Sequence, residues 1–172
     1  MNFGTSQEFT IQAHREPLNH PGVWGRISIH VQGATLGQID KFGALYVPAD
    51  FFRDLHDVVD NLWDQLFAHK SDAEIFTVLN NALWNDSDDS LQVAEQAWAR
   101  FHRFIFLSNW GEQFDGVKAF IIRPPGHPIR ILYASEGAIS IALCSPEAII
   151  EALSSFLKWF DAETAISLPA DI

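Results

Sequence analysis

The segment from Arg103 to Ser145 constrains the fold more than any other part of the sequence, because it contains four short apolar runs in close succession. Each run is rich in Ile, Phe, Val or Leu, and Gly or Pro residues separate them, as is typical of strands joined by turns. Connections this short cannot contain a crossover helix, so neighbouring strands should pair antiparallel. The segment therefore predicts a meander with strands at Phe104–Leu107, Val117–Ile122, Ile129–Tyr133 and Ala138–Leu143.

Alternation of apolar and polar residues predicts further strands near the N-terminus. One is expected at Glu8–Arg15, and a clearer pattern covers residues 22–33. A short partner strand is expected at Leu36–Ile39. In the clearest pattern, the apolar side chains that share one side are Ile27, Ile29 and Val31.

Four segments carry the apolar spacing of amphipathic helices. Pro48 can open the first, because its missing N–H is harmless in the first turn. Ser71 and Glu74 form a capping box at the start of the second. Segregated runs of strands and helices predict an α+β fold, with about four helices packed on one face of a largely antiparallel sheet. The helices are expected at Pro48–Phe67, Ser71–Trp84, Leu91–Phe101 and from Pro146 to about Glu163.

Length and composition fit one globular domain. The chain has 172 residues, of which 48% are hydrophobic, so it can bury a substantial core. No linker or internal repeat divides it. We expect a single domain over residues 1–172, with a core at roughly 9–160 and a loosely held tail after 163.

The formal net charge of −11 limits the classes of partner. A surface of this sign repels nucleic acid phosphates and anionic lipids, so neither is expected to bind. It attracts a basic protein, although the same charge also serves solubility alone. The N-terminus lacks the basic and apolar segments of a signal peptide, and no apolar run reaches the roughly 18 residues that span a bilayer. We therefore expect a cytoplasmic protein.

The first predicted helix carries an acidic face that only Arg53 interrupts. Like charges at helical spacing repel by a few tenths of a kcal/mol per pair. A chain that tolerates this cost can use the field to steer a cationic partner, whereas the simpler alternative is an ordinary solvent-exposed face. The candidate contacts on this face are Asp50, Asp54, Asp57, Asp60 and Asp64.

A second candidate surface is the loop 109–115, between two predicted strands. Aromatic residues surrounded by polar groups are common anchors of interfaces, so we count Trp110, Glu112 and Asp115 as candidate contacts. The alternative for Trp110 is that its ring folds back onto the core.

Residues with catalytic or metal-binding potential form no recognisable motif. The seven histidines lack the spacing of a zinc hydrolase site, and the acidic run 85–90 lacks the Gly and Glu of a calcium loop. The single cysteine, Cys144, excludes an intramolecular disulfide. Cys144 lies where a strand meets a helix, which can activate a thiol, but buried structural cysteines are also common.

The residues Trp24–Ile29, followed by Gly33 and Leu36-Gly37, resemble the start of Imm42-type immunity proteins of bacterial polymorphic toxin systems. The acidic helix after a strand pair and the late strands before Ser145-Pro146 add to the likeness, which covers roughly residues 9–160. The resemblance implies a cytoplasmic protein that binds and neutralises a cognate toxin encoded beside it. It implies no catalytic residue and no cofactor.

Two other classes of function stay open at this point. One is a small enzyme whose site is assembled from dispersed residues such as His30, His102, Glu112 and Asp115. The other is an adaptor or secretion chaperone that binds its partner without abolishing an activity. The oligomeric state is also open, since a sheet edge at the first or last strand could pair two copies.

Overall fold

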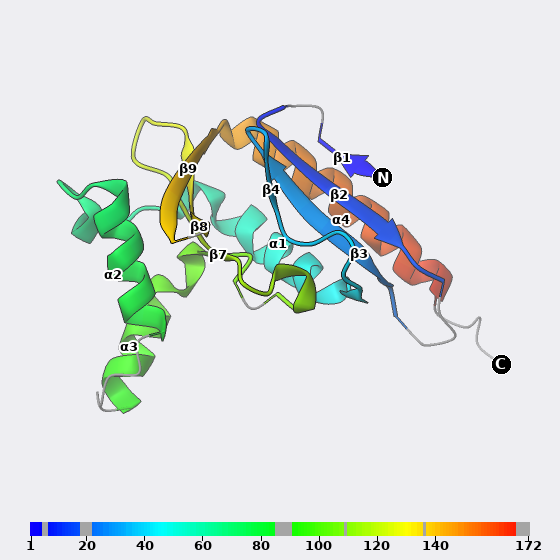
Figure 1. Cartoon of the computed structure of the whole chain (residues 1–172), viewed down its shortest axis with the longest axis horizontal. Helices are drawn as coiled ribbons and strands as arrows, with labels where there is room; N and C mark the ends of the chain where they lie inside the picture. Colours follow the sequence, from blue (N-terminus) through cyan, green and yellow to red (C-terminus); the bar gives the residue numbers. More distant parts are fainter. Residues whose placement is uncertain (5–6, 18–21, 85–90, 109, 136, 168–172) are drawn as a thin grey trace.

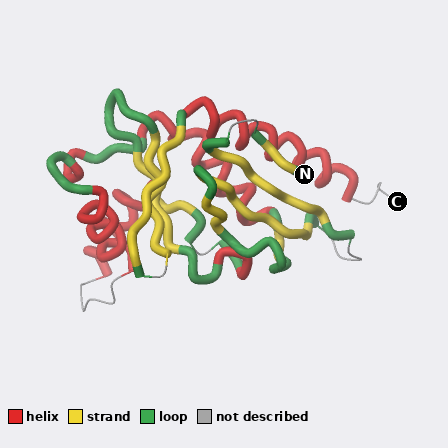
Figure 2. Tube along the Cα trace, turned by 45° about the horizontal axis from the view of Figure 1, so that its top comes forward, coloured by secondary structure: helices red, strands yellow, loops and turns green. Residues whose placement is uncertain are grey.

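The computed structural model confirms an α+β fold with antiparallel sheets and helices packed on them (Figures 1 and 2). The strands form two sheets that lie side by side, rather than one. The α-helices are α1 (Tyr46–Val58), α2 (Asp72–Trp84), α3 (Leu91–Phe101) and α4 (Pro146–Ser167). The structure describes all residues except 5–6, 18–21, 85–90, 109, 136 and 168–172.

The N-terminal strands form sheet A, in the order β1-β2-β3-β4, with β5 also paired to β3. The strands predicted at Glu8–Arg15 and within residues 22–33 are confirmed. The short partner strand exists, but it begins earlier than Leu36 and ends there, because Gly37 turns the chain with a φ of +90°. The strands are β1 (Asn2–Phe3), β2 (Phe9–Arg15), β3 (Trp24–Val31), β4 (Ala34–Leu36) and β5 (Gly43–Ala44).

The predicted meander forms sheet B, in the order β6-β7-β8-β9 with every neighbour antiparallel. Its first strand is shorter than expected, because Phe104 lies in a 3₁₀ turn and Leu107 adopts a φ of +62°. Helix α2 covers one face, where Phe76 and Trp84 contact the buried ring of Phe120. The strands are β6 (Ile105–Phe106), β7 (Lys118–Ile122), β8 (Ile129–Ser135) and β9 (Ala138–Cys144).

The first helix ends earlier than the sequence predicts. Helix α1 stops at Val58, and two 3₁₀ turns, η1 (Val59–Asn61) and η2 (Gln65–Phe67), replace the rest of the predicted helix. Between them Asp64 is extended, and its side chain caps the second turn. The apolar stripe predicted for this helix is therefore wrong at its C-terminal end. Leu66 is 41% exposed, and Phe67 is buried in the core instead.

The remaining helices begin where the sequence indicates. The capping box is confirmed, because Ser71 N–H donates to Glu74 Oε2 at 2.7 Å and Glu74 N–H donates to Ser71 Oγ at 3.3 Å. Helix α3 has the expected bounds, but only Phe101 of its apolar stripe is buried. Helix α4 lies along sheet A, and the buried residues of its predicted stripe are Ile149, Leu153, Phe156 and Phe160.

Candidate functional site

The five aspartates predicted to share one helical face lie in three different settings. Asp50, Asp54 and Asp57 are on α1, whereas Asp60 belongs to η1 and Asp64 to the extended segment after it. The single acidic face is therefore wrong beyond Val58, because the helix that would have carried it ends there.

Two of these aspartates, Asp50 and Asp60, pair with arginines. Arg53 bridges Asp50 at 2.9 Å and Asp161 of α4 at 2.5 Å. Arg123, which follows β7, pairs with Asp60. Exposed pairs of this kind contribute little to stability, but they cancel part of the negative field that the sequence pattern indicates.

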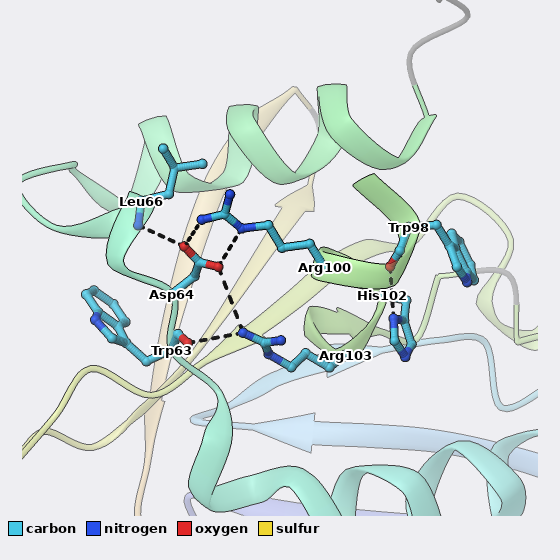
Figure 3. A network of polar contacts seen from close by, with 7 residues as sticks. All are labelled: Trp63, Asp64, Leu66, Trp98, Arg100, His102 and Arg103. Atoms are coloured by element: carbon cyan, nitrogen blue, oxygen red, sulfur yellow. Dashed lines mark hydrogen bonds and ion pairs between the residues drawn. The ribbon is translucent and has the colours of Figure 1, made fainter. Parts of the chain in front are cut away.

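Asp64 is held by groups from several directions (Figure 3). Its Oδ1 accepts hydrogen bonds from the Leu66 N–H at 2.8 Å and from Arg100 Nη2 at 2.5 Å, and its Oδ2 accepts one from Arg100 Nε at 2.8 Å. Arg103 Nη2 lies 3.9 Å from Oδ2 and donates to the Trp63 carbonyl at 3.3 Å. The Arg100 hydrogen bond is the main reason that the pKa of Asp64 is lowered. With its side chain 9% exposed, Asp64 fastens the segment after α1 to α3. We call this arrangement the Asp64 clamp.

Asp54 and Asp57 remain open to a partner. Both are exposed on α1, and His56 Nδ1 lies 3.8 Å from Asp57 Oδ1. Among the described residues, Asp54 has no ion pair. The two carboxylates edge a cavity of about 370 Å³, which we call the acidic pocket. Its other lining residues are Phe51, Leu55, Val58, His102, Arg103 and Ile105.

An exposed tryptophan lies beside the acidic pocket. Trp98 on α3 is 53% exposed and stacks on His102, with the ring centroids 6.0 Å apart. His102 Nδ1 is 2.9 Å from the Trp98 carbonyl, which fixes the two rings together (Figure 3). Trp98 also lines a second cavity, of about 380 Å³, between α2 and α3. The two cavities therefore adjoin through the Trp98–His102 pair.

The sequence reasoning missed Trp98 as a candidate contact, because its spacing with Leu91 and Phe101 predicts a buried helical stripe. In the structure Leu91 is 76% exposed and Phe101 is buried. A hydrophobic period shows which face of a helix is apolar, but not whether another element covers that face.

The loop 110–115 divides its candidate contacts between core and surface. Trp110 is 2% exposed, and its ring centroid lies 4.8 Å from that of Phe51 and 5.2 Å from that of Phe52. It offers no exposed surface to a partner. Glu112 and Asp115 are exposed at η4 (Glu112–Phe114) and just after it.

The residues considered for catalysis are not brought together. His30 contacts Gln12 and Thr35 on sheet A, whereas His102 lines the acidic pocket. Across the described part of the chain, no group of His, Cys, Asp and Glu side chains could hold a metal ion. The acidic run considered for calcium lies outside the described residues. Burial raises the pKa of the Cys144 thiol to about 12, which favours the protonated form over the nucleophilic thiolate at neutral pH.

Comparison with known proteins places the chain in a family. The profile described as Imm42, immunity protein 42, matches residues 1–159. The chain belongs to the Imm42 family. The resemblance carried by Trp24–Ile29 is therefore confirmed, and the chain is an immunity protein of the polymorphic toxin type. Immunity proteins of such families inhibit toxins without catalysis, so this Imm42 protein is not an enzyme.

A solved structure shares the fold of this Imm42 protein. The crystal structure of CdiI from Burkholderia dolosa AUO158 matches with a TM-score of 0.61 and 12% identity, over 92% of this chain and 99% of that chain. An identity this low shows a common fold alone. The comparison with curated proteins found no match. Among the described helices, none has the length and apolar character needed to cross a membrane.

Proposed function

We propose that this Imm42 protein neutralises a cognate toxin domain by tight, stoichiometric binding in the cytoplasm. The contact surface is assigned from the pair Asp54 and Asp57. Both line a cavity of mixed apolar and charged residues, whereas neighbouring aspartates are held by arginines. A partner with a basic side chain can reach these carboxylates without displacing an arginine.

The surroundings of the two carboxylates support an interface. Trp98 supplies a large exposed ring next to the pocket, and tryptophan is among the residues that most often anchor interfaces. Phe51, Leu55 and Ile105 give the pocket an apolar floor on which a partner side chain can lose water. The surface thus combines an apolar centre with an acidic rim, as interfaces commonly do.

The charge of the chain supports a basic partner. With a formal net charge of −11, the protein attracts a cationic toxin domain over distances beyond direct contact. We infer that residues 1–172 act as one domain in this binding, because side chains of both sheets, α1 and α4 belong to one continuous core. Glu112 and Asp115 form a rival acidic surface at η4.

The test is rescue of growth. The C-terminal region of the protein encoded next to this chain is expressed in a sensitive host, with and without the Imm42 protein. We expect growth to be restored by the Imm42 protein, but not by an unrelated acidic domain of similar size. A toxic neighbour that kills equally in both cases would overturn the proposal for that pair.

The same assay tests the surface. The double variant Asp54→Lys/Asp57→Lys should fail to rescue, whereas the single variant Asp40→Lys, at an exposed loop position elsewhere, should rescue fully. Both variants should be soluble and folded by circular dichroism, so that loss of rescue reports binding. Full rescue by the double variant would contradict the proposal that the acidic pocket binds the toxin domain.

A further inference from the structure

Strand β9 is an edge of sheet B with an apolar face open to solvent. The sheet order β6-β7-β8-β9 places it last, with β8 as its neighbour. Its alternate side chains Ile139, Ile141 and Leu143 are 36%, 45% and 45% exposed, whereas Ala142 and Cys144 on the opposite face are buried.

Helix α2 covers this face of the sheet only in part near the edge. In the register of the sheet, Phe120 lies opposite Leu132, and Leu132 lies opposite Ile141, so these side chains form one row on one face. Phe76 and Trp84 of α2 cover Phe120, and Leu132 is fully buried. Helix α2 also approaches β9, but it leaves Ile141 45% exposed.

The main chain of β9 also has free groups along this edge. The Leu143 N–H donates to Gln32 Oε1 at 3.1 Å, so it points away from β8. In an antiparallel strand every second residue points its N–H and C=O the same way. The corresponding groups of Ile139 and Ile141 therefore also point outward, and among the described residues no strand pairs with that side.

The strand lacks the usual protection of an edge. Soluble proteins commonly place Lys, Pro or a bulge on an edge strand to prevent pairing with another chain. The sequence of β9 is AISIALC, with no charged residue and no proline. An edge of this kind is suited to occupation by another strand.

We propose that β9 pairs antiparallel with β9 of a second copy, around a two-fold axis at Ser140. This register places Ile139 of each copy opposite Ile141 of the other. The outward N–H and C=O groups of both residues are then satisfied reciprocally, as a two-fold interface requires. Leu143 can keep its bond to Gln32. The exposed isoleucines of both copies form one apolar cluster.

The features of β9 favour a second copy over the toxin domain. The strand is neutral, so it offers a cationic partner no opposite charge, and self-pairing sets no like charges opposite one another. In the antiparallel register, the outward N–H and C=O groups of Ile139 in one copy face the C=O and N–H groups of Ile141 in the other. The acidic pocket includes Ile105 of β6, at the other edge of the same sheet. A dimer through β9 therefore leaves both acidic pockets open.

The pairing is expected to be weak and to strengthen with salt. One pair of short strands is smaller than the roughly 1,200–2,000 Å² that stable interfaces bury. Each copy carries a formal charge of −11, so long-range repulsion opposes association. Salt screens this repulsion, because the Debye length falls to about 8 Å at physiological ionic strength.

The experiment is sedimentation velocity on the full chain from micromolar to near-millimolar concentration, at low and high salt. We expect the mean mass to rise with concentration from 19.4 kDa towards twice that value, and to rise further in high salt. Ile141→Lys should remain monomeric throughout. The matched control Ile166→Lys, at a 72% exposed position of α4, should associate like the unaltered chain, since both variants change the charge equally.

Amide hydrogen exchange locates the contact. The N–H groups of Ile139 and Ile141 should exchange more slowly as the dimer forms, whereas a dimer through another surface would leave their rates unchanged and overturn the proposal. A constant monomer mass at every concentration and salt would overturn it too. Rescue of growth by Ile141→Lys is expected to be intact, and its loss would assign the edge to the toxin domain instead.

Discussion

Two aspartates and two tryptophans of this Imm42 protein, which look equivalent in the sequence, lie in different settings. Asp64 is bound by Arg100, and Trp110 is enclosed by aromatic rings. By contrast, Asp54 lines a cavity and Trp98 is 53% exposed. The difference teaches that residue type and spacing indicate a surface, whereas the distant groups packed against it decide whether a partner can use it.

The largest contrast is expected between the two tryptophans. Trp110→Ala should lower the free energy of unfolding by about 3–5 kcal/mol, because it leaves a cavity among Phe51, Phe52 and Phe106. Trp98→Ala should change the unfolding free energy by less than about 1 kcal/mol, because the ring is half exposed. Urea denaturation measures both. Equal losses of unfolding free energy in the two variants would show that the two rings are equally buried, which would contradict the comparison.

A smaller contrast is expected between the aspartates. Asp64→Ala should lower the unfolding free energy by about 1 kcal/mol, since it removes hydrogen bonds to a charged group that is itself half exposed. Asp54→Ala should leave the thermal midpoint unchanged, because no described group pairs with it. Thermal unfolding followed by circular dichroism distinguishes these outcomes, and an unstable Asp54→Ala would assign that residue to the scaffold.

A still smaller effect is expected in how the stability contributed by Asp64 changes at acidic pH. Because the pKa of Asp64 is lowered in the folded state, its contribution is present above the ordinary carboxyl pKa of about 3.9 and is lost as pH falls through the lower folded value. The difference in stability between the unaltered chain and Asp64→Asn should therefore be constant from pH 7 to about pH 5 and shrink below about pH 4. A difference that grows on acidification would contradict the clamp.

Much of the architecture followed from local patterns. The meander, the two long N-terminal strands, the capping box at Ser71 and the buried stripe of α4 were all predicted, because each depends on periodicity and turn residues close in sequence. The division of the strands between two sheets was not, since it depends on how the strand groups pack around the helices.

The candidate site was predicted only in part, for a physical reason. The setting of Asp64 depends on Arg100 and Arg103, which contact it from a helix and a turn more than 30 residues away. The exposure of Trp98 and the burial of Trp110 depend on which elements cover them. None of these is a local property, so the sequence indicated aspartates and a tryptophan without showing which ones a partner can reach.

The most direct test of the account is the affinity of the toxin domain for two charge-matched double variants, measured by calorimetry at low and high salt. Asp54→Lys/Asp57→Lys should weaken binding more than tenfold and flatten its salt dependence, because it reverses the rim of the acidic pocket. Glu112→Lys/Asp115→Lys makes the same change in net charge at the other exposed acidic surface and should weaken binding much less. Equal losses, or a larger loss in the second variant, would contradict the assignment of toxin binding to the acidic pocket.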